Sequence, residues 1–374
     1  MIYADNAATT RLADEALEAM LPWLRDEYAN PSQPYSFSRK AKKALSDARE
    51  NIASCIGAQP EEIYFTSGGT ESDNWAIKGS VYACDDHNKS LITSAFEHHA
   101  VLNAAESLRR FQYPVQYIPP NSDGMVCASA LASGISGEIG LISVMMANNE
   151  LGTIQSICEL AEIAHTHGAI FHTDAVQAVG HIPVDVNALG VDLLSASAHK
   201  FNGPKGVGFL FIRKGTKILP HENGGSQEHG LRAGTENIAG IIGMAEALHL
   251  NSKNLNENRE YVHKLELQLL RDLEGAGVSY QRNGTSPFLP GLLSLSFPDF
   301  DGEAILHRMD LLGIAIATGS ACDSVNTQIS HVLQAIGLDN RFAKGTIRIS
   351  LGKNNSSKEV DSIVAALKKI VKKH

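Results

Sequence analysis

The chain has 374 residues, of which 43% are hydrophobic and 20% charged, and its formal net charge is −9. This size and apolar content predict a globular protein with a substantial core and two structural domains. The acidic charge argues against nucleic-acid binding, and no apolar run approaches the about 20 residues that span a bilayer. We therefore expect a cytoplasmic protein with neither a membrane partner nor a direct nucleic-acid partner.

Helical patterns alternate with short apolar strands from about Leu12 to Leu250. This alternation predicts an α/β fold with a doubly wound, mostly parallel sheet. Strands are expected at residues 63–66, 90–93, 140–145, 169–172, 193–196 and 208–212. The last of these follows Lys200 too closely for a helical crossover, so we expect it to run antiparallel to its neighbour.

A polar, asparagine-rich stretch at residues 251–258 precedes a helix that is expected to reach about Leu273. We interpret this stretch as a domain boundary. Strands near 292–297, 314–317 and 345–351, with a final helix from Ser357, predict a smaller α/β unit. The expected division is a large domain of residues 12–255 and a small domain formed by residues 1–11 and 256–374.

Asp174 and Lys200 are the most informative pair in the sequence. Asp174 lies two residues after the predicted strand at 169–172, and Lys200 follows a short Ser/Ala strand 26 residues later. A lysine amine can form an imine with pyridoxal 5'-phosphate (PLP), and a buried carboxylate keeps the pyridine nitrogen protonated so that the ring accepts electrons. The pair therefore predicts a PLP site, whereas a surface lysine after a strand is the alternative.

A glycine-rich turn, Ser67-Gly68-Gly69-Thr70, lies between a predicted strand and a predicted helix. Free amides at such a helix start, together with the hydroxyl of Thr70, can bind a phosphate. Ser197 and His199, which flank Lys200, can donate to the same group. A turn without a ligand and a structural core histidine are the alternatives at these positions.

Other candidate residues follow predicted strands in the same way. His98 comes after the strand at 90–93, where an imidazole can stack on a cofactor ring and move protons. Asn149 lies in a polar turn that can bind a cofactor hydroxyl or form only an Asx turn. Arg348 lies within a predicted strand, where a guanidinium needs a partner, either a substrate carboxylate or a structural acid.

The five cysteines form no Cys-x-x-Cys pair, which argues against a disulfide framework or a zinc site, and we expect no metal. Cys322 differs from the others because it lies in a Gly/Ser-rich stretch after a predicted strand. Such a thiol can be exposed and reactive, although an idle thiol is the alternative. The long polar loop at 224–237 offers a further hydroxyl and an arginine to a phosphate.

Taken together and in this order, the motifs resemble those of cysteine desulfurases, which are fold-type I PLP enzymes of the aminotransferase class V group. The motifs run almost end to end and lie at residues 5–10, 30–32, 65–71, 148–150, 172–177, 195–200, 227–237, 319–322 and 347–352. The segment from Cys322 to Leu333 resembles the branch with an extended catalytic-cysteine loop. The chain departs from the family pattern at Tyr35, at Ser38 and at residues 323–329.

The resemblance implies a role for each matching residue. Lys200 would hold PLP and move the substrate α-proton, His98 would stack on the ring and handle protons, and Cys322 would accept sulfur as a persulfide. The implied cofactor-binding set is Gly69, Thr70, His98, Asn149, Asp174, Gln177, Ser197, His199, Lys200 and Thr235. Thr235 would come from the partner subunit of a homodimer, and Arg348 with Asn30 would hold the substrate carboxylate.

The implied reaction converts L-cysteine to L-alanine and passes sulfur to an acceptor protein. Iron–sulfur cluster assembly and the thiolation of tRNA or a cofactor are equally compatible destinations. A selenocysteine lyase and a class V aminotransferase are the alternative activities, since both would share the lysine and the fold.

Overall fold

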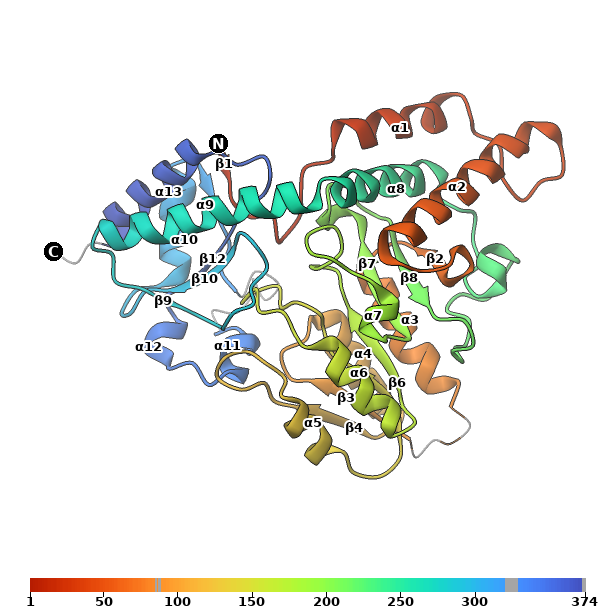
Figure 1. Cartoon of the computed structure of the whole chain (residues 1–374), viewed down its shortest axis with the longest axis horizontal. Helices are drawn as coiled ribbons and strands as arrows, with labels where there is room; N and C mark the ends of the chain where they lie inside the picture. The colour runs from red at the N-terminus through yellow and green to blue at the C-terminus, as the bar shows by residue number, and fades with distance from the viewer. Residues whose placement is uncertain (85, 87–88, 320–328, 372–374) are drawn as a thin grey trace.

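The computed structural model describes the whole chain except residues 85, 87–88, 320–328 and 372–374. The central feature is a seven-stranded sheet, which Figure 1 shows in the right half of the molecule. Its strands, in spatial order, are β2 (Ile63–Thr66), β8 (Gly208–Ile212), β7 (Leu193–Ser197), β6 (Ile170–Asp174), β5 (Ile139–Ser143), β3 (Ser90–Ser94) and β4 (Val115–Ile118).

The strands from β7 to β4 are parallel, whereas β8 is antiparallel to both β7 and β2. The predicted α/β fold with a mostly parallel sheet is therefore confirmed, as is the reversed direction of residues 208–212. The sequence reasoning missed β4, a short edge strand whose side chains are mostly half-buried and whose apolar run is interrupted by Gln116. Such a strand lacks the continuous apolar signal of a central parallel strand.

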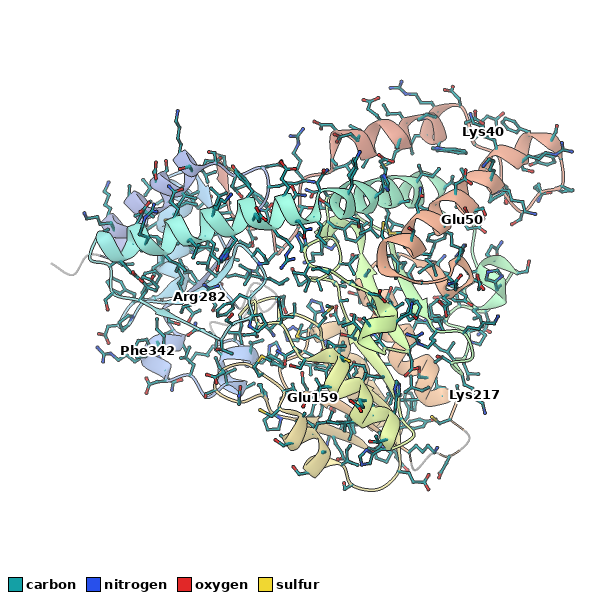
Figure 2. All side chains as sticks on the ribbon, in the orientation of Figure 1. Lys40, Glu50, Glu159, Lys217, Arg282 and Phe342 are labelled. Carbon is teal, nitrogen blue, oxygen red and sulfur yellow. The ribbon has the colours of Figure 1, made fainter. Side chains whose placement is uncertain are left out.

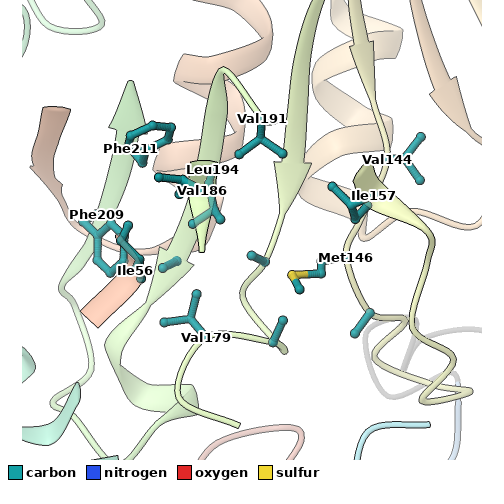
Figure 3. Close-up of a cluster of buried hydrophobic side chains, with 14 of the residues drawn as sticks. Ile56, Val144, Met146, Ile157, Val179, Val186, Val191, Leu194, Phe209 and Phe211 are labelled. Carbon is teal, nitrogen blue, oxygen red and sulfur yellow. The ribbon is translucent and has the colours of Figure 1, made fainter. Parts of the chain in front are cut away.

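Helices cover both faces of this sheet because successive side chains of a strand point to opposite sides. In β8, Phe209 and Phe211 belong to one buried cluster, whereas Leu210 and Ile212 belong to another. Figure 3 shows Phe209 and Phe211 packed with Leu194 and Ile56 on the first face. The helices around the sheet are α1 (Asp14–Arg25), α2 (Arg39–Ile56), α3 (Gly69–Tyr82), α4 (His99–Arg110), α5 (Ala128–Gly134), α6 (Ile157–Thr166), α7 (Val186–Leu189) and α8 (Ile238–Lys253).

A third buried cluster gathers the C-terminal part of the chain with Ala4. Its three-stranded antiparallel sheet has the order β12 (Thr346–Ser350), β10 (Leu292–Ser296) and β9 (Gln281–Arg282). Near the N-terminus, β1 (Ile2–Tyr3) pairs in parallel with β11 (Ile314–Ala315). The helices of this part are α9 (Leu255–Gly275), α10 (Gly302–Leu311), α11 (His331–Ala335), α12 (Asn340–Ala343) and α13 (Ser357–Ile370).

The predicted boundary at residues 251–258 is not a loop. The stretch is helical apart from Asn254, because α8 ends at Lys253 and α9 begins at Leu255. Its polar residues are used in tertiary contacts: buried Asn251 donates to the carbonyl of Phe201 at 2.6 Å and accepts from Lys353 at 2.8 Å. The division into two domains stays a prediction.

Charged side chains such as Lys40, Glu50 and Glu159 cover the outer surfaces of the helices (Figure 2). Short 3-10 turns occur at η1 (Ser36–Ser38), η2 (Pro60–Glu62), η3 (Ala198–Lys200) and η4 (Gln227–Gly230). In the described part of the chain, no helix combines the length and the apolar character needed to cross a bilayer.

Candidate active site

A cavity of about 630 Å³ lies where the parallel strands of the large sheet end. Ligands of open α/β sheets bind at this edge, outside the carboxyl ends of the strands. Ten of the predicted site residues line the cavity: Gly69, Thr70, His98, Asn149, Asp174, Gln177, Ser197, His199, Lys200 and Arg348. The fold therefore brings together residues that are up to 279 positions apart in the sequence.

Three predicted residues are not among those that line the cavity. The side-chain oxygen of Asn30 accepts the amide of Ser32 at 2.9 Å, within its own turn. Thr235 is exposed in the loop before α8. Cys322 lies outside the described residues. The roles predicted for all three therefore stay predictions.

Asp174 is the last residue of β6 and is buried at the cavity wall. One of its oxygens accepts the amide of Val176 at 2.9 Å. Burial raises the pKa of its carboxyl, and the neighbouring His98, the Val176 amide and Lys200 act in the opposite direction. A buried carboxylate with nearby positive groups can pair with a cationic ring nitrogen.

The amine of Lys200 reaches the cavity from the end of η3. It donates to the carbonyls of Ala7 at 2.6 Å and Ala8 at 3.0 Å. The side chain of Gln177 donates to the same Ala7 carbonyl at 2.9 Å. The N-terminal segment thus lies beside the lysine, although its sequence alone carries no chemical signal for this position.

The start of α3 forms another part of the cavity wall. Gly68 has φ 148°, a conformation that disfavours any side chain, and a Cβ on Gly69 would lie 2.6 Å from the Val176 side chain. Among the described residues, no side chain caps the first amides of α3. Thr70 and Ser197 also line the cavity. These amides and hydroxyls form a cradle for an anion such as a phosphate.

His98 is the N-cap residue of α4, and its Nδ1 accepts the amide of Ala100 at 3.1 Å. Because Nδ1 is an acceptor, the neutral ring carries its proton on Nε2. Burial is the largest cause that lowers the pKa of His98, followed by Lys200 and His99, whereas Asp174 raises it. Burial therefore favours the neutral form of the ring.

Arg348 in β12 connects the two parts of the molecule at the cavity. Its Nη2 pairs with Asp5 at 2.8 Å, and its Nη1 donates to the carbonyl of Asn149 at 3.0 Å. Asp5 is thus the structural acid that was one of the two possible partners predicted for this arginine. Asn148 accepts the amides of Glu150 and Leu151, both at 2.9 Å, and this Asx turn holds Asn149 at the cavity.

Sequence reasoning missed several residues that line the cavity, among them Asp73, His99, Met145, Glu150, Lys205 and His331. Asp73 carried a usable signal, because it is an acid one turn after Gly69 on a helix that packs against the sheet. His331 had none, since α11 reaches the site only through tertiary packing, where its Nε2 donates to the carbonyl of Glu97 at 2.9 Å.

The residues present fit PLP. The cradle at the start of α3 matches a phosphate, Asp174 matches a ring nitrogen, and Lys200 supplies an amine within the same cavity. The polar loop at 224–237 contributes indirectly, because Arg232 pairs at 2.9 Å with Glu71 in the first turn of α3. The contact of this loop with a phosphate stays a prediction.

Comparison with known proteins gives a consistent result. The sequence model of the family described as Aminotransferase class-V matches residues 2–363. The chain is 47% identical over 373 residues to "Cysteine desulfurase IscS" of Dictyoglomus turgidum, a match that covers 100% of this chain and 95% of that protein. It is also 41% identical over 374 residues to "Putative cysteine desulfurase IscS 1" of Bacillus subtilis, covering 100% of this chain and 99% of that one.

Solved structures share the fold over nearly the whole chain. A structure described as "NIFS-LIKE PROTEIN" superposes with a TM-score of 0.93 at 38% identity and covers 99% of this chain and 98% of its own. Another, described as "SspA in complex with cysteine", has a TM-score of 0.85 at 35% identity, with 95% and 100% of the two chains covered.

Proposed function

This chain belongs to the class-V aminotransferase family, and we propose that it is a PLP-dependent cysteine desulfurase. The observation that carries the proposal is the convergence of Asp174, Lys200 and the open start of α3 on one cavity. The relatives named cysteine desulfurase support the same activity, since they match the full length of the chain. The substrate would be L-cysteine, because one similar structure is a complex with cysteine.

When bound, PLP supplies an electron sink that weakens the bonds at the substrate α-carbon and the C–S bond at the β-carbon. In our proposal the amides at the start of α3, with Thr70, Ser197 and His199, hold its phosphate. Asp174 faces the ring nitrogen and keeps it protonated, and Gln177 and Asn149 bind the ring hydroxyl. Lys200 holds the aldehyde carbon.

Arg348 would bind the carboxylate of the cysteine substrate, and its position beside the cavity supports this role. Its pairing with Asp5 leaves the guanidinium oriented, which reduces the entropy lost on binding. Asn30 is proposed to assist. Lys200 would remove the proton from the α-carbon, and His98, neutral with its proton on Nε2, would exchange protons near the sulfur.

The sulfur step uses Cys322. Its thiolate would attack the substrate sulfur, so that an S–S bond forms as the C–S bond breaks, with the bonding electrons and a proton retained in the released L-alanine. One L-cysteine and one Cys322 thiol thereby give one L-alanine and one Cys322 persulfide. No external oxidant or reductant is required until the persulfide passes to its acceptor.

The test compares the native protein with the Cys322→Ala variant, with Cys158→Ala as a control at an exposed cysteine. Alanine and sulfide are measured from L-cysteine with dithiothreitol present, and selenide from L-selenocysteine. We expect Cys322→Ala to lose release from cysteine and the control to keep it. Full activity of Cys322→Ala on cysteine would contradict the mechanism, and activity on selenocysteine alone would indicate a selenocysteine lyase. Transfer of an amino group to a 2-oxo acid without sulfide release would indicate an aminotransferase.

We further propose a cytoplasmic homodimer of two-domain subunits, in which Thr235 of one subunit completes the phosphate site of the other. The exposure of Thr235 away from its own cavity supports this arrangement. The sulfur acceptor would be a protein of iron–sulfur cluster assembly or of tRNA or cofactor thiolation. A Thr235→Ala variant mixed with a Lys200→Ala variant should recover some activity if sites are shared, because mixed dimers then contain one intact site.

A further inference from the structure

A second buried carboxyl lies beside Asp174 and has no part in the mechanism above. Asp73, on α3, is buried, and one of its oxygens, one oxygen of Asp174 and one ring nitrogen of His98 lie within 4.8 Å of one another. Two carboxyl groups this close in a buried site do not both ionise near neutral pH, because each charge opposes the other. The pair must therefore retain a proton.

The surroundings of Asp73 do not support a negative charge. Within the described part of the chain, its Oδ1 has no hydrogen-bond partner. The nearest basic side chain is His172, whose Nε2 is 3.7 Å from that oxygen. His172 is itself buried between the hydroxyls of Ser143 at 2.8 Å and Ser195 at 3.0 Å, and burial lowers its pKa to about 3. It is thus neutral and supplies no positive charge to Asp73.

Asp174 is better placed to carry the charge. It accepts a backbone amide at 2.9 Å, and both Lys200 and His98 favour its ionised form. The third acid near the pair, Glu97, is buried, and burial is the main cause that raises its pKa to about 8. Glu97 is therefore mostly uncharged at neutral pH and does not compete with Asp174 for the positive groups.

We propose that Asp73 is a positioning residue that keeps the single proton of the Asp73–Asp174 pair, so that Asp174 alone presents a negative charge to the cavity. This inference rests on the proposed cofactor site, because a carboxylate at Asp174 is what a protonated ring nitrogen requires. Asp73 approaches the carboxylate of Asp174 from α3 and acts on the chemistry only through Asp174.

The titration behaviour of the cluster agrees with this assignment. Burial is the largest cause that raises the pKa of Asp73 well above its usual value, and the charge of Asp174 raises it further. Glu97 adds to the increase where it is ionised, and a hydrogen bond from Ser195 opposes it. The groups that face the pair are Glu97 and His98 before α4, His172 in β6, Ser195 in β7 and Lys200 in η3.

The test is infrared difference spectroscopy of the full-length, PLP-loaded protein, between native and Asp73→Asn. The asparagine keeps the shape of the neutral acid. Between about pH 6 and about pH 8, we expect the native protein to show one protonated carboxylic-acid carbonyl band that Asp73→Asn lacks, in addition to the band that protonated Glu97 gives in both proteins. PLP affinity, measured by equilibrium dialysis, should change less than about threefold in Asp73→Asn and fall at least about tenfold in Asp174→Asn, which loses the charge.

Two further variants keep the test decisive. Ser195→Ala removes the one hydroxyl that stabilises the charged form, so the acid band should persist to higher pH; this measurement stands even if Asp73→Asn does not fold. Asp14→Asn, an exposed acid, should leave the band unchanged. Loss of the band in Asp174→Asn but not in Asp73→Asn would overturn the proposal, as would equal losses of PLP affinity. None of these readouts requires desulfurase activity, so a failure of the proposed function would be seen separately.

Discussion

Gly69→Ala is expected to weaken PLP binding through a single steric contact. An alanine Cβ at this position would lie 2.6 Å from Cγ2 of Val176, well inside the separation of non-bonded carbon atoms. Gly69 is helical and is not among the residues with positive φ, so alanine adds no backbone strain. The contact is relieved only if the start of α3 moves away from Val176, and the phosphate-facing amides move with it.

The expected magnitude follows from the cost of overpacking. Such contacts cost about 1 to 3 kcal/mol, which corresponds to a roughly 5- to 150-fold increase in Kd at about 1.4 kcal/mol for each factor of ten. The assay is equilibrium dialysis of PLP against the apoprotein, with pyridoxal, which lacks the phosphate, measured in parallel. We expect the affinity for PLP to fall more than the affinity for pyridoxal.

Two variants test the reasoning. Val176→Ala in the Gly69→Ala background removes Cγ2 and should restore most of the affinity. Gly275→Ala, at the end of α9, has no heavy atom within 4 Å of its new Cβ and should leave PLP binding unchanged. Unaltered PLP affinity in Gly69→Ala, or no recovery in the double variant, would refute the steric explanation.

Three further predictions concern other parts of the site. Arg348→Lys replaces a planar guanidinium, which can pair with Asp5 and bind a carboxylate at the same time, by a single amine. Steady-state kinetics should therefore show the KM for cysteine raised about tenfold or more, with a smaller change in kcat. Glu97→Gln removes a carboxyl whose pKa is about 8 in the folded protein and about 4.5 in the unfolded chain. Because the folded state holds this proton more tightly, the native protein loses stability as pH rises from about 4.5 to about 8. Thermal unfolding should show a smaller loss of stability with pH in the variant. Ser330→Ala removes a 2.6 Å hydrogen bond to Glu150. Because Ser330 lies eight residues after Cys322, the proposed sulfur acceptor, rapid-quench assays should show slower persulfide formation with unchanged PLP affinity.

Much of the fold was predictable because its signals are local. A central strand such as β7 is buried on both faces and reads as an uninterrupted apolar and small-residue run, and β8 was recognised as antiparallel from the short connection after Lys200. The polar stretch at residues 251–258 was interpreted from its composition as a domain boundary; in the structure it is helical apart from Asn254, and Asn251 binds Phe201 and Lys353, which are distant in the sequence. Composition cannot reveal such partners.

The sequence by itself determined the chemistry proposed for this protein, because Asp174, Lys200 and the glycines at the start of α3 follow strands whose ends meet at one edge of the sheet. Only the tertiary structure decided how those groups are charged. Asp73 acts on Asp174 because α3 packs on the sheet, and Ala7 meets Lys200 because the N-terminal segment passes beside it. Burial and proximity set a proton's position, and both arise from contacts that the chain makes only when folded.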